Sequence, residues 1–195
     1  MTRIIAGLAG GRRLAVPSGR STRPTSDRAR EGLFAAVLAM LGSLDGTSVL
    51  DLYAGSGAVG LEALSRGAAD VIMIESDPGA AQVIRRNIEA IALPGATLVQ
   101  DKVGRALRRG PGEAWPRDLV FADPPYSTPD DEVGAVLAAL ADHGWLATDA
   151  LVVTERDARS GPPPWPKGYS SQRSRRYGET LLWYGRASGA PPAAD

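Results

Sequence analysis

Short apolar runs alternate along most of this chain with longer stretches in which apolar residues recur every three or four positions. The runs predict buried strands, and the stretches between them predict helices that cover a sheet. Strands are expected at 48–54, 71–75, 97–100, 119–122 and 151–155. An alternation of strand and helix, sustained here to about residue 141, is typical of a doubly wound α/β domain with a mostly parallel sheet.

The N-terminal segment does not follow this alternation. Residues 3–24 mix small, apolar and basic residues around Gly10-Gly11, which predicts a short hairpin or an extended arm. The sequence from Thr22 to Asp27 is expected to end the arm and to cap a helix. That helix has an apolar stripe that should pack on the sheet, formed by Leu33, Phe34, Val37, Leu38 and Leu41.

The C-terminal segment also differs from the alternating pattern. Two runs, 170–177 and 179–186, follow a proline-rich loop and are joined at Gly178, which predicts an antiparallel hairpin that closes the sheet. Residues 187–195 are small and proline-rich, and we expect a disordered tail there. The chain thus divides into a basic N-terminal arm or hairpin (1–25), one α/β domain (26–186) and the tail.

Composition narrows the classes of protein to consider. With 195 residues, of which 44% are hydrophobic, the chain is long enough for one α/β core. It has no run of 18 apolar residues, so no membrane span is expected. The absence of cysteine fits a cytoplasmic protein and removes mechanisms that need a thiolate. A single histidine, His143, leaves a zinc site or a Ser-His-Asp hydrolase unsupported, and we expect no metal.

Charge is unevenly distributed, although the formal net charge is zero. Residues 1–30 carry seven arginines and one acid, a net of +6 that the rest of the chain balances. A basic arm on an acidic body indicates a polyanionic partner, such as the phosphates of a nucleic acid. Arg28 and Arg30 lie in the first turn of a predicted helix and oppose its dipole, which indicates an anion nearby. The arginines expected to contact phosphate are Arg3, Arg12, Arg13, Arg23 and Arg28.

A glycine-rich loop, Gly55-Ser56-Gly57-Ala58-Val59-Gly60, lies between the strand predicted at 48–54 and a helical pattern. Glycines there let the chain turn tightly and let a ligand approach the N-terminus of the helix. Glu75 follows Gly55 by twenty residues, at the end of the next predicted strand, where a carboxylate can bind two ribose hydroxyls. The pattern predicts a nucleoside-type cofactor, and a dinucleotide-binding Rossmann domain has the same pattern.

Asp51 favours S-adenosylmethionine over a dinucleotide. It lies four residues before Gly55, where a carboxylate can reach the cationic amino-acid end of that cofactor but would repel a pyrophosphate. Asp101, after the strand predicted at 97–100, is placed to bind an adenine amino group, and a simple helix cap is the alternative. The residues expected to bind the cofactor are Asp51, Tyr53, Gly55, Ser56, Gly57, Glu75, Asp101 and Asp123.

The tetrapeptide Asp123-Pro124-Pro125-Tyr126 follows the strand predicted at 119–122. Its two prolines fix φ and remove two N–H donors, so the carbonyls of the turn are expected to stay free as acceptors. The motif predicts a site for a nucleobase with an exocyclic NH₂ group, whose two N–H bonds go to the Asp123 carboxylate and the Pro124 carbonyl while Tyr126 stacks on the ring. All four residues are candidate catalytic residues. A proline-rich strand exit with a surface tyrosine is the structural alternative.

Motifs spread over nearly the whole chain match one family. They are Arg3-Ile4-Ile5-Ala6-Gly7 with Gly10-Gly11-Arg12, Thr22-Arg23-Pro24-Thr25 with Asp27-Arg28 and Arg30-Glu31, Leu50 to Gly57, the Asp-Pro-Pro-Tyr turn, and Arg176-Tyr177-Gly178 with Thr180. Together they resemble the bacterial 16S rRNA guanine-N2 methyltransferases of the RsmD type. Tyr53 stands where the family often has phenylalanine, and Lys102 stands where it often has a small residue.

The resemblance implies a fold and an activity. The fold is a class I S-adenosylmethionine-dependent methyltransferase, Rossmann-like, with a seven-stranded and mostly parallel sheet closed by an antiparallel hairpin. The activity is methyl transfer to N2 of a guanine in 16S rRNA, on an assembled or assembling small ribosomal subunit. We expect a cytoplasmic monomer with S-adenosylmethionine as cofactor and residues 26–186 as the methyltransferase domain.

Three other functions use some of the same features. An adenine-N6 methyltransferase of DNA or RNA could use the same turn, although 195 residues leave no room for a separate target-recognition domain. A nicotinamide oxidoreductase shares the glycine loop and would bind pyridine nucleotides. A non-catalytic RNA-binding factor of ribosome assembly would keep the basic arm but would not require Asp123.

Overall fold

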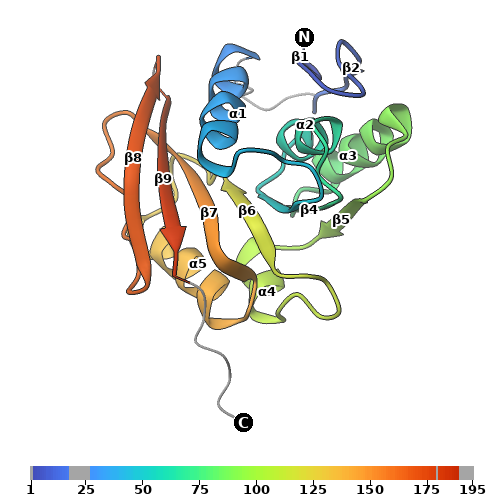
Figure 1. Ribbon diagram of the computed structural model, residues 1–195. Coiled ribbons are helices and arrows are strands. Elements are labelled where there is room, and N and C mark those ends of the chain that lie inside the picture. The colour runs from blue at the N-terminus through green and yellow to red at the C-terminus, as the bar shows by residue number, and fades with distance from the viewer. Residues whose placement is uncertain (1, 18–26, 179, 189–195) are drawn as a thin grey trace.

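The computed structural model describes residues 2–17, 27–178 and 180–188 (Figure 1). A seven-stranded sheet in the order β5-β4-β3-β6-β7-β9-β8 forms its centre, and a two-stranded sheet, β1-β2, lies near the N-terminus. The strands are β1 (Thr2–Arg3), β2 (Arg13–Leu14), β3 (Ser48–Leu52), β4 (Asp70–Glu75), β5 (Ala96–Gln100), β6 (Arg117–Ala122), β7 (Leu146–Asp157), β8 (Tyr169–Tyr177) and β9 (Thr180–Ala187). The helices are α1 (Asp27–Leu41), α2 (Ala58–Ser65), α3 (Pro78–Ile91), α4 (Val103–Arg108) and α5 (Asp130–Asp142). No helix in these described ranges is long and apolar enough to cross a membrane.

Helices cover both faces of the central sheet (Figure 1). Successive residues of a strand point to opposite faces, so a fully apolar strand serves two cores at once. In β3, Val49 belongs to a core formed with α1, α2 and α3, whereas Leu50 and Leu52 belong to a second core formed with α4 and α5. The same division runs through β4 and β6. Burial on both faces explains why these strands read as continuous apolar runs.

Pairing in the central sheet changes direction only at β9. Strands β3 to β7 pair in parallel, and β9 is antiparallel to both β7 and β8. The predicted fold class is therefore confirmed, including the seven strands and the closing hairpin. Because the five parallel strands point the same way, their carboxyl ends meet at one edge of the sheet, which we call the carboxyl edge.

The N-terminal hairpin, residues 2–14, packs against α2. Ile4 is fully buried in the first core, and the backbone N–H groups of Ile5 and Ala6 donate to the buried carboxylate of Glu62 at 2.6 and 3.0 Å. Gly7 has φ +85°, and a Cβ there would lie 1.8 Å from the Ser65 carbonyl oxygen, so the close approach of hairpin and helix requires glycine.

The predicted strands of the central sheet are confirmed to within two residues at each end, except at the start of β7. β7 begins at Leu146, five residues before the predicted run, because the exposed polar residues Thr148 and Asp149 interrupt the apolar pattern, and Asp149 has φ +64°. The hairpin predicted in 3–24 is present as β1-β2. The predicted cap at 22–26 and the phosphate contact predicted for Arg23 lie outside the described residues, as do residues 189–195 of the predicted tail.

Candidate active site

Five acidic residues lie at the carboxyl edge, each at or just beyond the end of one of five neighbouring parallel strands. In spatial order they are Asp101 after β5, Glu75 in β4, Asp51 in β3, Asp123 after β6 and Glu155 in β7. Sequence analysis selected the first four. It did not select Glu155, which appeared only as the last residue of a predicted strand.

The glycine loop forms the turn between β3 and α2. Tyr53 has φ +60°, Gly55 has φ +59° and Gly57 has φ +76°, so three of five consecutive residues adopt the left-handed region. Gly57 precedes α2 and has no side chain to cap it, and in the first turn of the helix the Gly60 N–H donates to the Asp51 carboxylate. A Cβ on Gly57 would lie 3.0 Å from the Met73 sulfur, so the loop is pressed onto β4.

Asp51 is 2% exposed and accepts a hydrogen bond from the Gly60 N–H at 2.9 Å. Burial raises the pKa of Asp51 to about 7, the Gly60 hydrogen bond lowers it, and the negative charge of Glu75 raises it further. The carboxylate thus lies under the glycine loop with little solvent to stabilise its charge. A cation bound above the loop would favour the ionised form.

Glu75 organises the same loop from β4. Its two carboxylate oxygens accept hydrogen bonds from the backbone N–H groups of Gly55 at 2.9 Å and Asp77 at 2.7 Å. From α3, the buried amide of Asn87 donates to the carbonyls of Ser56 and Ala15. Asn87 is a residue that sequence analysis missed, since a lone asparagine in an amphipathic helix carries no motif.

Asp101 is held by cations. Its carboxylate forms ion pairs with Arg105 and Arg109 and accepts from the Lys102 N–H at 2.7 Å. Burial alone would raise the pKa of Asp101, but the hydrogen bonds from Arg105 and Lys102 and the charges of both arginines outweigh it and lower the pKa. An adenine amino group at this position would share the carboxylate with these arginines.

The Asp-Pro-Pro-Tyr turn extends from the end of β6. The Asp123 N–H approaches the Leu52 carbonyl at 3.4 Å, which keeps Asp123 in line with β3. The expectation that the carbonyls of the turn stay free is wrong for Pro125, because its carbonyl accepts from the Thr128 N–H at 2.8 Å and closes the turn. Pro124 is buried, whereas the Tyr126 side chain is 62% exposed, as stacking on a ligand requires.

Asp123 lies in a negative environment. Burial raises the pKa of Asp123 well above the usual value for aspartate, and the nearby negative charges of Glu155 and Asp51 raise it further. A carboxyl with a raised pKa is a better proton acceptor once it is ionised. Asp123 therefore combines a hydrogen-bond acceptor with a base at the point where the turn begins.

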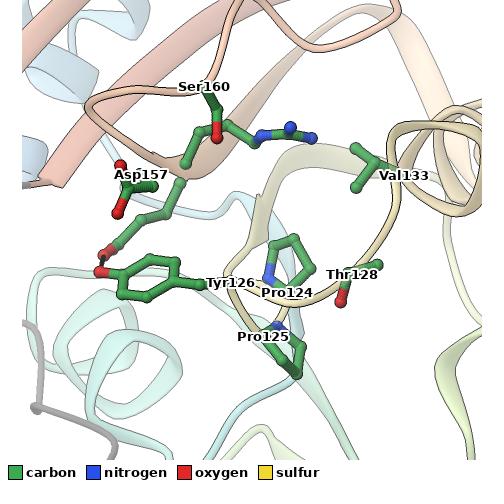
Figure 2. Close-up of a pocket in the computed structure, with 9 residues that line it drawn as sticks. Pro124, Pro125, Tyr126, Thr128, Val133, Asp157 and Ser160 are labelled. Carbon is green, nitrogen blue, oxygen red and sulfur yellow. Dashed lines mark hydrogen bonds between the residues drawn. The ribbon is translucent and has the colours of Figure 1, made fainter.

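A shallow pocket borders the outer side of this turn (Figure 2). It is lined by Pro124, Pro125 and Tyr126 of the turn and by Glu155 and Arg156 at the end of β7, among others. Figure 2 shows the hydroxyl end of Tyr126 turned towards the segment that carries Asp157 and Ser160, and the dashed line is its 3.3 Å hydrogen bond to Glu155.

Comparison with known proteins establishes the family. The family model described as Conserved hypothetical protein 95 matches residues 2–186. Ribosomal RNA small subunit methyltransferase D of Escherichia coli is 36% identical over 177 residues, which cover 91% of this chain and 85% of that protein. The chain belongs to the RsmD family. A candidate rRNA methyltransferase of Bacillus subtilis, YlbH, is 33% identical over 91% of this chain and 95% of its own length.

A solved structure agrees with this assignment. A candidate methyltransferase of Escherichia coli, yhhF, superposes with a TM-score of 0.83 at 35% identity, and the match covers 96% of this chain and 98% of that one. This RsmD-family chain is thus a methyltransferase with S-adenosylmethionine as its cofactor. The glycine loop before α2 and the carboxylates of Asp51 and Glu75 fit such a group, since they offer close backbone approach and acceptors for an ammonium and for hydroxyls.

The arginines predicted to contact phosphate are in different surroundings in this RsmD-family fold. Arg13 and Arg28 are exposed. The Arg12 guanidinium donates to the carbonyls of Ala90 at 3.2 Å and Ile91 at 2.7 Å, and so satisfies the C-terminal end of α3. Arg3 is exposed and lies 3.5 Å from the Asp27 carboxylate.

Arg30 corrects one expectation. The anion expected near the first turn of α1 is, for Arg30, part of the protein itself, because its buried guanidinium pairs with Asp27 at 3.0 Å and lies 3.9 Å from Glu62. Glu62 in turn pairs with Arg66 at 2.7 Å. Sequence analysis missed Glu62, which joins the hairpin, α1 and α2 from within the core.

Proposed function

We propose that this chain transfers a methyl group from S-adenosylmethionine to the exocyclic N2 of a guanine in small-subunit (16S) ribosomal RNA. The observation that carries the proposal is the position of Asp123, one strand away from Asp51 and the glycine loop and at the base of a turn that ends in an exposed tyrosine. The relatives named as rRNA methyltransferases support the choice of RNA.

The cofactor would be held by the residues around the glycine loop. Asp51 would bind its amino-acid end, Glu75 its ribose hydroxyls and Asp101 its adenine. Gly55, Ser56, Gly57 and Tyr53 would provide the close backbone approach. When bound, S-adenosylmethionine supplies a methyl group on a sulfonium, which is a strong electrophile without any metal.

The contribution of the protein's own residues would be to activate guanine N2, which is a poor nucleophile. The lone pair of a guanine N2 is delocalised into the ring, and two acceptors that hold both of its hydrogens draw the nitrogen towards a tetrahedral shape. The Asp123 carboxylate and the Pro124 carbonyl would be these acceptors, with Pro125 stiffening the turn and Tyr126 stacking on the base. Good alignment of reactants lowers a barrier by about 7–11 kcal/mol. After transfer, the nitrogen releases one proton, and Asp123, with its raised pKa, can accept it.

The RNA would approach from the side of the hairpin and α1. Exposed Arg13 and Arg28, with Arg3, would contact its phosphates, and the target base would leave any stack to reach Tyr126. Unstacking costs about a few kcal/mol and less in an unpaired loop, where sequence-specific RNA recognition usually occurs.

The experiment is methyl transfer from labelled S-adenosylmethionine to small ribosomal subunits that lack the modification, followed by identification of the labelled nucleoside. The expected product is N2-methylguanosine at a single position, formed by the wild type and far more slowly by Asp123→Ala. Naked 16S rRNA is assayed in parallel to identify the substrate state. Label in adenosine or only in DNA would contradict the substrate, and binding without any transfer would favour an assembly factor.

A further inference from the structure

Glu155 joins two segments at the active site that are not adjacent in sequence. It is 3% exposed at the carboxyl edge, on the strand that pairs with β6, and Ala122 pairs with Thr154 immediately before it. Its Oε1 accepts from the Tyr126 hydroxyl at 3.3 Å and from the Thr180 hydroxyl at 3.1 Å. One carboxylate oxygen thus links the catalytic turn to the first residue of β9.

The far side of this link is fixed by α1. Thr180 pairs across the hairpin with Tyr177, and a Cβ on Gly32 of α1 would lie only 2.3–2.5 Å from atoms of the Tyr177 ring. The ring therefore lies directly on the backbone of α1, where only glycine leaves room. The Tyr177 ring thus holds the tip of the hairpin against α1. Because Thr180 and Tyr126 both donate to Glu155, the position of Tyr126 is fixed relative to this tip.

Glu155 also acts on Asp123 through its charge. The charged or titratable groups that face Asp123 are Asp51 from β3, Glu155 from β7 and Tyr126 from its own turn. Beyond the effect of burial, the negative charge of Glu155 raises the pKa of Asp123 more than that of Asp51 does. A neutral residue at position 155 would keep the fold of the strand and remove this influence.

We propose that Glu155 is a positioning residue for methyl transfer, which anchors the Tyr126 ring to the C-terminal hairpin and sets the charge beside Asp123. The inference rests on the proposed function of Asp123 and Tyr126. It gives a structural role to the segment Arg176-Tyr177-Gly178 and to Thr180. Tyr177 holds the hairpin against α1, Gly178 forms the turn with φ +66°, and the Thr180 hydroxyl donates to Glu155.

Two variants separate the anchor from the charge. Glu155→Gln keeps the shape of the side chain and removes the charge, whereas Thr180→Val removes one hydrogen bond and keeps every charge. Glu113→Gln is the matched control, since Glu113 is exposed in the loop before β6, at the opposite edge of the sheet. Turnover and KM for S-adenosylmethionine are measured from pH 5 to 9 on small subunits.

Glu155→Gln should lower kcat roughly tenfold, as expected when a hydrogen bond to a charged group is weakened, with KM for S-adenosylmethionine within about twofold of wild type. The acid limb of its kcat profile should move to lower pH, because Asp123 then ionises more easily. Thr180→Val should lower kcat by a smaller factor and leave the acid limb in place. Glu113→Gln should match wild type in every parameter.

A second readout does not depend on any substrate. The Asp123 carboxyl is titrated by carbon-13 NMR in protein labelled at the aspartate carboxyl carbons, with the Asp123 signal identified by its loss in Asp123→Asn. Glu155→Gln should titrate at lower pH than wild type and Glu113→Gln at the same pH. An unchanged kcat or an unchanged Asp123 titration in Glu155→Gln would overturn the inference. A labelled nucleoside other than N2-methylguanosine would instead refute the proposed function, and the titration would still decide the role of Glu155.

Discussion

Ionisation of the buried Asp51 carboxyl is unfavourable in the free protein, and a cationic ligand would favour it. Its pKa is raised to about 7 by burial, so near pH 6.5 much of the free protein carries a protonated Asp51. Binding of a cationic amino-acid end favours the ionised carboxylate. We expect S-adenosylmethionine to bind more tightly as the pH rises through about 7 and to release a proton when it binds below that pH.

Calorimetry in two buffers with different ionisation enthalpies measures this proton release. Asp51→Asn should bind more weakly and release no proton, whereas Asp142→Asn, at an exposed position at the end of α5, should behave as wild type. The contribution of Asp51 to stability changes with pH in the opposite direction to its contribution to cofactor binding. Because the folded-state pKa of Asp51 is raised, its contribution to folding is full below about pH 4 and is lost as the pH rises to about 7. A pH-independent affinity would contradict a contact with Asp51.

Asp123 should matter for turnover far more than for cofactor binding. Asp123→Ala removes the group proposed both to accept an amine hydrogen and to take up the released proton, and we expect a loss in kcat of about 10²–10³-fold. The dissociation constant for S-adenosylmethionine, measured by calorimetry, should stay near that of wild type. Equal turnover in mutant and wild type would refute the role of this carboxylate.

Residues that could be predicted from sequence are those whose chemistry is tied to a local pattern. Asp51, Glu75 and Asp123 stand at fixed offsets from a glycine loop, a strand end or a proline pair. Glu155 and Glu62 have no such pattern, because the backbone and hydroxyl groups that donate to them lie 25 to 57 residues away in the sequence, and the one near partner, Arg66 beside Glu62, forms an ordinary i,i+4 pair. The apolar run predicted at 151–155 ends in an acidic residue, Glu155, just as the run at 119–122 is followed by Asp123, and a comparison of the two was the signal available.

At the scale of elements, the contact between α1 and the C-terminal hairpin depends on a missing side chain. In a helix interior, glycine to alanine normally stabilises by about 0.5–1 kcal/mol. In Gly32→Ala the new Cβ would collide with the Tyr177 ring, so we expect the opposite sign, a loss of about 1–3 kcal/mol in the free energy of unfolding.

Gly104→Ala in α4 is the matched control, because its Cβ would meet only the Arg108 guanidinium at 3.5 Å, an ordinary contact. It should be neutral or stabilising. Urea denaturation of the two variants measures both signs. Stabilisation by Gly32→Ala would show that the Tyr177 ring does not rest on α1.

The hairpin at the N-terminus and α2 are joined by a buried carboxylate. Glu62→Ala would remove the acceptor for Ile5 and Ala6 and leave the buried Arg30 without one of its anions. We expect a loss of about 3–5 kcal/mol in the free energy of unfolding, as for other broken buried ion pairs. Glu89→Ala, at an exposed position of α3, should change it by no more than about 0.5 kcal/mol. A loss below 1 kcal/mol for Glu62→Ala would show that the hairpin is held mainly by Ile4 and Leu14.

For the whole molecule, the separation of charge predicts how binding of RNA depends on salt. Each phosphate contact to a single strand adds about 0.7 to the slope of log affinity against log salt. The double variant Arg13→Ala/Arg28→Ala should reduce the slope by about 1.4. Arg108→Ala, at an exposed position of α4, should leave it unchanged, and Arg12→Ala should act mainly on stability, since Arg12 binds the end of α3. Fluorescence titration of an rRNA fragment at several salt concentrations provides the slopes. An unaltered slope in the double variant would show that these two arginines do not contact phosphates.

The place of Thr180 at the start of β9 has a consequence for synthesis of the protein. A chain emerges from the ribosome with its N-terminus first. The glycine loop and the Asp-Pro-Pro-Tyr turn therefore emerge well before β9, whose Thr180 donates to Glu155. β9 is also an inner strand, between β7 and β8, and the sheet remains open until it inserts. A nascent chain can thus contain the elements proposed to bind the cofactor before Thr180 is available to hold Glu155. With the role proposed for Glu155, the site is complete only once β9 has been synthesised and has paired with β7.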